Sequence, residues 1–562
     1  MRTSTTRTST AIFGTLAAVA TATMLASASS QKFYIDDPVW QERDTQDASG
    51  MKPLEPRLFV DLTYNVLKGS GAVNPARAKN VNTVDEVPDS SWFTNRAGQP
   101  GGQSLGRRPL TAEDVAKGPD TGDGPAPGTW TITSSKSDGV TPGFTIKDVK
   151  GERWFLKFDP PGYRAMSTGT EVAVTKLMWA LGYNVPENHI SYMRREQLVV
   201  GGTAKYTPAS GKPRAMRLDD LDTLLGRASR EQDGFFRVVA SKALPGKPIG
   251  RVRFDGTRPD DPNDIVPHED RRELRGYGVF AAWLNHVDAK SINSLDSLIA
   301  ENGRSYVRHH IIDFGSALGS GGGGPSEYWE GAEYLIQPHE VMKQMRAFGF
   351  YFPKWRTTPF YEASSIGRLP ADNADFDPDQ WKPRVPNQAF LHARADDKFW
   401  AAQKLVAITT DMLRAAVRAG EFGDPAAEDF LVRALAERRD AIGRAYLTAI
   451  NPIADPELDA SSLTFRNAAV DADVARAPQG YRAEWFAFDN TTRATECLAE
   501  TSDRTSRLQV PAGLPQRDGS FVKVALSAVG SSHASWEAPV QAYFRRHQGS
   551  WQLVGFERMT EQ

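Results

Sequence analysis

Residues 284–295 read LNHVDAKSINSL, and they join an apolar segment to polar side chains placed at regular offsets. The spacing is His286-x-Asp288-x-Lys290-x-x-Asn293. On its own, this pattern fits either the polar end of a helix or a loop that gathers acidic, basic and amide groups for catalysis. The elements on both sides of the motif distinguish these two interpretations.

Upstream of the motif, the sequence predicts strands that are followed by helices. The strand-like runs are residues 129–134, 144–148, 153–159, 184–193 and 235–244. Thr170 is the predicted N-cap of a helix that ends at Gly182. A second helix with a continuous apolar face is predicted over residues 269–285. This helix leads directly into the motif.

Downstream of the motif, the sequence predicts a β-hairpin. Its strands are residues 295–300 and 306–313, and Asn302-Gly303 between them is a strong turn signal. The second strand ends in Asp313-Phe314-Gly315. The glycine-rich residues 319–325 that follow are expected to be irregular.

The last part of the chain predicts two helices and then a separate β region. The helices are expected at residues 396–419 and 425–450, and Asp424-Pro425 marks the start of the second. From about residue 460 the sequence alternates between apolar and polar residues, and a hairpin is expected around Gln548-Gly549. This alternation predicts a small β domain over residues 460–562.

Taken in order, these elements and their polar residues resemble the protein-kinase fold. Residues 286–293 match the catalytic-loop pattern H-x-D-x-K-x-x-N at every fixed position, and Asp313-Phe314-Gly315 matches the metal-binding DFG motif. The resemblance extends over about residues 129–450. It implies an α+β fold with a β-rich N-lobe and a helical C-lobe, in a kinase-like domain assigned to residues 129–455.

The resemblance gives each residue of the two motifs a role in phosphoryl transfer. Asp288 would orient the acceptor hydroxyl and take its proton, and Lys290 would stabilise the phosphoryl group as it moves. Asp313 and Asn293 would hold Mg²⁺, which prefers hard oxygen ligands. His286 would brace the loop.

The resemblance also assigns the residues that hold ATP in the N-lobe. Lys157 would clamp the α- and β-phosphates, and Glu171 would keep this lysine charged and oriented. No Gly-x-Gly-x-x-Gly loop lies between the first two predicted strands, where one would cover the phosphates. The candidates for covering the phosphates are instead Ser135, Lys136 and Ser137.

Two departures from the common kinase pattern point to an atypical branch. Val287 replaces the arginine that commonly precedes the catalytic aspartate, and no APE-like segment follows the DFG motif. The stretch ALGYNVP, residues 180–186, is closer to atypical kinases such as the HipA-like and CotH-like groups.

Each of these residues also has an ordinary structural explanation. Lys157 fits a solvent-facing strand position, and Glu171 fits the first turn of a surface helix. Asp-x-Gly occurs in many turns. We favour the kinase-like interpretation because the matches occur together, in the expected order and on suitable elements.

The N-terminal segment predicts export. Arg2 and Arg7 precede the uncharged residues 11–25, and Ala26-Ser27-Ala28 provides a small-x-small cleavage site. Residues 1–30 are therefore expected to be a signal peptide, with an uncleaved N-terminal anchor as the alternative. The mature chain would be periplasmic or extracellular, with no membrane span. Residues 31–128 are expected to form an N-terminal extension and a Gly/Pro-rich linker.

The composition limits the remaining possibilities. The 562 residues carry a formal net charge of -2, which gives no general attraction to nucleic acid. Cys497 is the only cysteine, so an intramolecular disulfide is impossible and a thiolate metal cluster is excluded. The zinc-protease motif H-E-x-x-H is missing.

The expected function is an exported, Mg²⁺-dependent phosphotransferase that moves the γ-phosphoryl group of ATP to a hydroxyl of a protein or a small molecule. One alternative is a catalytically silent protein that binds nucleotide or serves as a scaffold or adhesion module. Another is a nucleotidyl transferase, because the same carboxylates and metal would serve that reaction.

Overall fold

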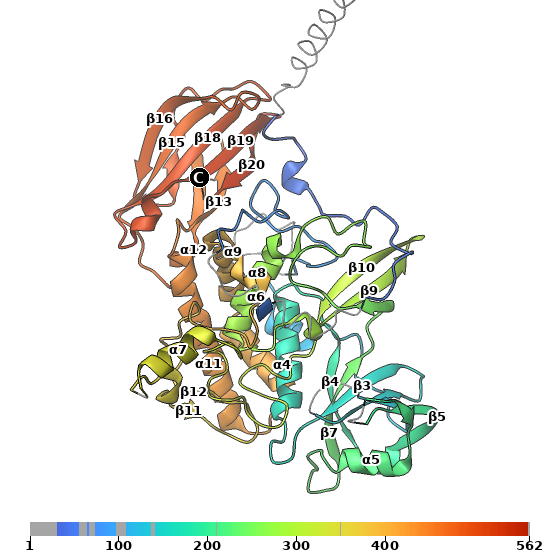
Figure 1. Cartoon of the computed structure of the whole chain (residues 1–562). Coiled ribbons are helices and arrows are strands. Elements are labelled where there is room, and N and C mark those ends of the chain that lie inside the picture. Colours follow the sequence, from blue (N-terminus) through green and yellow to red (C-terminus); the bar gives the residue numbers. More distant parts are fainter. Residues whose placement is uncertain are drawn as a thin grey trace, which may run out of the picture.

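The computed structural model describes residues 31–54, 65–66, 73–96, 108–136, 141–208, 211–348 and 350–559. The predicted signal peptide and Ser137 lie outside these residues. Figure 1 shows a β-rich lobe, a helical lobe and, at the far end, a second β region. This arrangement confirms the α+β, bilobal architecture with an additional β region that the sequence predicts.

The β-rich lobe is built on a seven-stranded sheet with the order β4-β7-β3-β2-β1-β5-β6. The strands are β1 (Trp130–Ser135), β2 (Gly143–Lys147), β3 (Arg153–Phe158), β4 (Asn188–Met193), β5 (Leu198–Tyr206), β6 (Arg214–Ala215) and β7 (Phe236–Lys242). β1 and β5 are parallel, and the other pairs are antiparallel. Helix α5 (Leu218–Leu225) packs on one face. Lys157 lies on β3, at the middle of the sheet.

Helix α4 (Met166–Ala180) begins earlier than the sequence predicts, so the assignment of Thr170 as its N-cap is wrong. The Asp159 carboxylate instead accepts hydrogen bonds from the amides of Ala165, Ser167 and Thr168, each at 2.9 Å. An acidic group at a helix N-terminus accepts hydrogen bonds from the free amides there, and its negative charge interacts favourably with the positive end of the helix dipole. Glu171 is consequently a buried residue inside the helix and not a surface residue of its first turn.

A three-stranded sheet follows the first motif. It consists of β8 (Lys247–Gly250), β9 (Ser294–Glu301) and β10 (Arg304–Ile311), in the order β10-β9-β8. Asn302 and Gly303 both have positive φ, 52° and 76°, as a tight two-residue hairpin turn requires. The predicted hairpin is confirmed.

The helical lobe contains one more break than the sequence predicts. Its main helices are α6 (Arg272–Trp283), α8 (Gln388–Leu391), α9 (Ala395–Val406), α10 (Thr410–Ala419) and α11 (Pro425–Leu447). The single helix predicted over residues 396–419 is wrong, because α9 ends at Val406 and Thr409 caps α10 by accepting from the Met412 amide at 3.3 Å. The Asp424 cap of α11 is confirmed. The short helix α3 (Ala112–Lys117) packs against α4 and α10.

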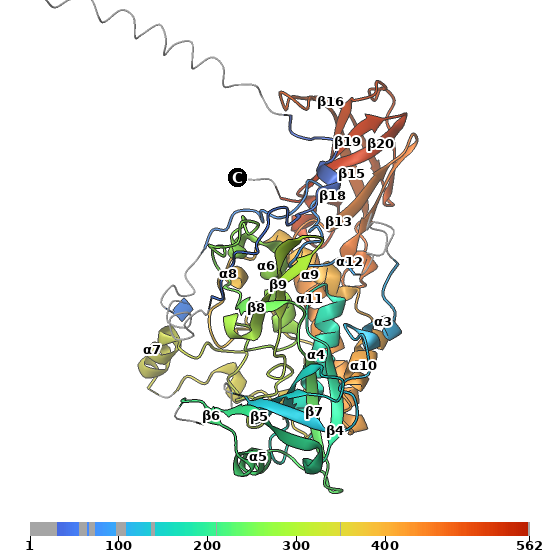
Figure 2. The same ribbon diagram turned by 90° about the vertical axis from the view of Figure 1, so that its right-hand side faces the viewer.

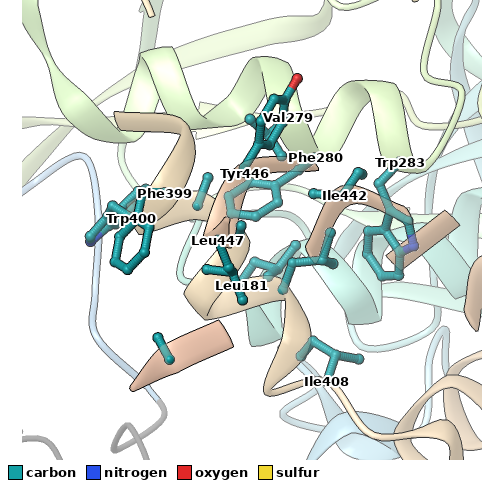
Figure 3. Close-up of a cluster of buried hydrophobic side chains, with 14 of the residues drawn as sticks. Leu181, Val279, Phe280, Trp283, Phe399, Trp400, Ile408, Ile442, Tyr446 and Leu447 are labelled. Carbon is teal, nitrogen blue, oxygen red and sulfur yellow. The ribbon is translucent and has the colours of Figure 1, made fainter. Parts of the chain in front are cut away.

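The core of the helical lobe is a cluster of large apolar side chains from α6, α9 and α11 (Figure 3). Phe280 and Trp283 from α6 belong to this cluster together with Trp400 from α9 and Ile442 from α11. The Trp283 indole N–H donates to the Leu435 carbonyl at 2.9 Å, so its one polar atom is satisfied. Burying each such side chain stabilises the fold by roughly 1.5–3 kcal/mol, and this core fixes α6 directly before the motif.

The segment after the DFG motif has little regular structure. The regular elements in its described part are α7 (Pro338–Arg346), the 3-10 helix η5 (Lys354–Arg356), β11 (Phe360–Tyr361) and β12 (Leu369–Pro370). The glycine-rich residues 319–325 form turns, as predicted. Gly319 has a φ of 72°, and a Cβ there would lie 1.8 Å from the Arg368 carbonyl oxygen, so only glycine fits.

The C-terminal region contains two antiparallel sheets. One has β13 (Ile453–Leu458), β14 (Ser462–Asn467) and β17 (Arg507–Gln509); the other has β15 (Gly480–Phe488), β16 (Thr495–Asp503), β18 (Phe521–Val529), β19 (Val540–His547) and β20 (Ser550–Glu557). A short helix, α12 (Ala468–Asp471), connects them. The hairpin predicted around Gln548-Gly549 is confirmed. Asn451, after α11, donates to the Leu526 and Ala538 carbonyls and joins this region to the helical lobe.

The N-terminal extension packs along the rest of the chain (Figure 2). Its Asp85 carboxylate pairs with the fully buried Arg272 of α6 at 2.8 Å. Asp397 of α9 binds both Arg272 and Arg275 at 3.0 Å. These buried ion pairs hold the extension, α6 and α9 together. Among the residues described, no helix has both the length and the apolar character needed to cross a bilayer.

We predict that Asp397→Ala lowers the free energy of unfolding by about 3–5 kcal/mol, because it leaves two buried guanidinium groups without their shared carboxylate. Asp429 provides a matched control, since it pairs with Arg414 at 2.9 Å on the exposed surface. Asp429→Ala should cost about 0–1 kcal/mol. Denaturant unfolding measures both values, and equal losses would contradict the structural role of the buried network.

Candidate active site

The centre of the candidate site is a cluster of one lysine and two carboxylates from three separate elements. The Lys157 ammonium on β3 donates to Glu171 Oε2 of α4 at 3.0 Å and to Asp313 Oδ1 of the DFG motif at 2.9 Å. Burial opposes the lysine charge, but Asp313 and Glu171 together outweigh it and raise the pKa of Lys157. The lysine is therefore charged and has a fixed direction.

Glu171 also fixes the backbone of the DFG motif. Its carboxylate accepts the Phe314 amide at 3.1 Å and the Gly315 amide at 2.9 Å. Asn188 on β4 donates to the same carboxylate at 3.3 Å and to the Thr175 hydroxyl at 2.8 Å. Because this carboxylate is buried, it needs these donors to offset the cost of removing it from water.

Asp313 has a backbone conformation that residues other than glycine rarely adopt. Its φ of 62° lies in the left-handed region, and such strain is concentrated at functional sites. Burial alone would raise the pKa of Asp313, but Lys157 and Lys136 lower it to about 2. The side chain is 38% exposed, so this ionised carboxylate is accessible to a ligand.

The catalytic-loop motif places Asp288 within a second group of polar side chains. Its carboxylate accepts from Lys290 at 2.7 Å and from the Asn293 amide nitrogen at 2.9 Å. The Ile312 amide donates to the Asn293 carbonyl at 3.0 Å, and this bond ties the loop to the residue that precedes Asp313. The two motifs therefore lie side by side, as the sequence predicts.

Arg384 is a member of this group that the sequence does not reveal. Its guanidinium approaches Asp288 Oδ1 at 3.3 Å and also pairs with Glu330, while its amide donates to the Val287 carbonyl at 2.8 Å. Burial opposes ionisation of Asp288, but Lys290 and Arg384 lower its pKa. No motif marks Arg384, because its partner lies far away along the chain.

His286 has a structural environment rather than a reactive one. The ring is buried, and neither nitrogen has a hydrogen-bond partner among the residues described. Burial lowers the pKa of His286 to about 4, against the attraction of Asp288 and Asp313. The neutral ring packs beside Phe314, with centroids 5.6 Å apart, and supports the DFG backbone.

The residues predicted to cover the phosphates differ in where they lie and what they contact. Lys136 faces the site closely enough to lower the pKa of Asp313, and its side chain also contacts the Thr141 hydroxyl at 3.3 Å. The Ser135 hydroxyl is buried and accepts from the Thr207 amide at 3.1 Å, so it is engaged with β5. Ser137 lies outside the described residues.

The donor set suits a hard cation that also binds phosphate. Asp313 presents an accessible carboxylate, and Asn293 uses its amide nitrogen on Asp288, which leaves its amide oxygen for a ligand. In the described part of the chain, no three His, Cys, Asp or Glu side chains converge into a complete metal site. Mg²⁺ commonly binds through one or two protein oxygens together with phosphates and water. The residues present fit that mode.

Comparisons with known proteins give matches among solved structures. No protein-family model matches the chain, and neither does any curated protein. A crystal structure of the Golgi casein kinase aligns at 11% identity with a TM-score of 0.29, and the same kinase with Mn/ADP bound at 13% and 0.30; each covers 73% of this chain and 94% of that chain. The Helicobacter pylori proinflammatory kinase CtkA aligns at 12% identity with a TM-score of 0.26, over 56% and 96% of the chains.

We predict that Glu171→Gln lowers the free energy of unfolding by about 1–3 kcal/mol, because the amide group turns one buried acceptor into a donor that faces other donors. Glu152→Gln is the matched control in the same lobe, since Glu152 is exposed and lies 3.7 Å from Lys242. The control should change stability by less than about 1 kcal/mol. Denaturant unfolding that gives the same small loss for both variants would show that Glu171 does not organise the site.

Proposed function

We propose that this chain is an exported, Mg²⁺-dependent phosphotransferase of an atypical kinase-like type, which moves the γ-phosphoryl group of ATP to a hydroxyl. The observation that carries this proposal is the Lys157–Glu171–Asp313 cluster, with Asp288 and Asn293 hydrogen-bonded beside it. A lysine, two metal-binding oxygens and a second carboxylate are the groups that phosphoryl transfer requires in one site.

Lys157 binds the α- and β-phosphates of the nucleotide. Glu171 holds its ammonium group in place, and the low pKa of Asp313 keeps that carboxylate ready to accept a cation at neutral pH. Asp313 and the Asn293 amide oxygen hold Mg²⁺, which supplies neutralisation of the phosphate charge when bound. Lys136 lies on the same side and adds positive charge near the phosphates.

Asp288 acts on the acceptor. Its pKa is lowered by Lys290 and Arg384, so it is ionised at neutral pH and orients the incoming hydroxyl. The hydroxyl proton passes to this carboxylate as the acceptor oxygen bonds to the γ-phosphorus, and the bond from that phosphorus to the β–γ bridging oxygen breaks, so that ADP leaves. Lys290 and Arg384 lie on the acceptor side and balance the negative charge of the moving group.

The acceptor is a protein or a small hydroxyl compound, and the predicted signal peptide makes the periplasm or the extracellular space the place of reaction. The absence of a glycine-rich phosphate loop and Val287 before Asp288 support an atypical branch, close to the HipA-like and CotH-like groups.

We predict that ATP with Mg²⁺ raises the melting temperature of the wild-type chain and of Asp429→Asn, but not of Asp313→Asn. Ligand at about 100 times its Kd stabilises the folded state by about 2.7 kcal/mol, which corresponds to about 2 °C for a chain of this size. Asp429 is a suitable control because it is an exposed aspartate on α11. A wild-type melting curve that ignores both ligands over a wide concentration range would contradict nucleotide binding.

We predict further that label transfer from γ-labelled ATP falls at least about 100-fold in Asp288→Asn, because the general base is lost. Nucleotide-dependent melting should persist in this variant, since Asp288 is not among the phosphate-binding residues. Transfer from α-labelled ATP instead would identify nucleotidyl transfer. Nucleotide binding without any transfer would favour the silent, scaffolding alternative.

A further inference from the structure

The region around α7 exposes an unusual concentration of large apolar side chains, which we call the α7 surface. Its members are Leu335, Ile336, Val341, Met342, Met345, Phe348, Phe350 and Phe352. Phe348 is 89% exposed, Phe350 87% and Met345 65%. Large apolar side chains exposed together in one short segment are typical of an interaction site.

The α7 surface is arranged so that a flat partner can reach it. Met345 follows Met342 by three positions and Val341 by four on α7, and Phe348 lies three positions beyond Met345, just past the helix. In both views of the molecule α7 lies at the outer edge, away from the C-terminal sheets (Figures 1 and 2). The apolar side chains of this surface are exposed to solvent.

Positive charge accompanies these apolar side chains. Lys343, Arg346, Lys354 and Arg356 are all exposed, whereas the described acidic side chain within α7 is Glu340. Lys343 lies 3.9 Å from Glu340, but in the part of the chain described no carboxylate pairs with Arg346 or Lys354. This local excess of positive charge contrasts with the formal net charge of -2 of the whole chain.

We propose that the α7 surface docks onto a lipid bilayer that carries anionic headgroups. Short amphipathic helices with apolar and aromatic side chains on one side and basic residues at the edge insert shallowly at the headgroup boundary. Aromatic rings favour that depth, and Trp355 and Tyr351 lie in the same segment. Each basic residue near an anionic surface strengthens binding by roughly fivefold.

Charge also argues against a second copy of this chain as the occupant. An isologous contact through the α7 surface would bring the four basic residues of each copy near those of the other. The cost of placing like charges together would oppose the gain from burying the phenylalanine rings. An anionic lipid surface satisfies both the apolar and the basic residues.

Docking through this surface would act on a segment that is connected to the candidate active site. The Leu335 amide donates to the Arg384 carbonyl at 2.8 Å, and the Arg384 side chain contacts Asp288. The lipid interaction itself does not depend on phosphoryl transfer, because none of the residues of the α7 surface belongs to the Lys157–Glu171–Asp313 cluster.

The test is co-sedimentation of the full chain with vesicles of phosphatidylcholine alone or mixed with phosphatidylglycerol. The wild type should bind the anionic vesicles, with weaker binding at high salt. Phe348→Ser combined with Phe350→Ser should weaken binding at least about tenfold, because two inserted rings are lost. Every variant keeps residues 1–30, so the difference reports the α7 surface and not the predicted signal peptide.

Two further variants make the outcome specific. Ile265→Ser removes an apolar side chain that is 76% exposed elsewhere and should bind like the wild type. Arg346→Glu combined with Lys354→Glu should lose the preference for anionic vesicles.

Equal binding of the Phe348/Phe350 double variant and the wild type would overturn the proposal. So would self-association without vesicles that the same double variant abolishes. Unchanged melting with ATP and Mg²⁺ in these variants would separate this result from the fate of the proposed function.

Discussion

The Glu171 carboxylate is the group on which the candidate site depends. It is buried, and an unpaired buried charge would destabilise the fold by several kcal/mol. Its donors come from β3 through Lys157, from β4 through Asn188 and from the backbone of the DFG motif. Satisfying this one carboxylate therefore requires the sheet, α4 and the end of β10 to meet at a single point. The position of Asp313 follows, because Gly315 and Phe314 are held by the same oxygens.

The sequence predicts the parts of the site that are carried by local motifs. Asp288 and Asn293 lie within one short loop, and their hydrogen bond needs no distant partner. The sequence misses the groups whose partners are remote. Arg384 contacts Asp288 from a segment with no recognisable pattern, and Asp159 replaces Thr170 as the cap of α4 from the end of β3. Spacing along the chain carries no information about such contacts.

A similar limit applies to charge and burial. The near-neutral formal charge hides a dense set of buried ion pairs around Arg272, Arg275 and Asp397, which lie in the interior although such residues are usually exposed. Helix boundaries can be predicted only where a local signal sets them. The Asp424 cap of α11 is such a signal. The break at Thr409 was not predictable, because a threonine inside an apolar periodic run gives only a weak signal.

The α7 surface shows that helical spacing of apolar residues can suggest burial where the side chains are exposed. Val341, Met342 and Met345 have the spacing of a core-facing helix, and only the three-dimensional structure shows that these side chains are exposed. This helix and Arg384 belong to the same long segment after the DFG motif, joined by the Leu335 to Arg384 backbone hydrogen bond. Under the proposed function, the residues that bind nucleotide must complement the charges of the phosphates and the metal. The segment that contacts Asp288 is free of that constraint, and it is therefore where acceptor specificity and location on a surface can be set together.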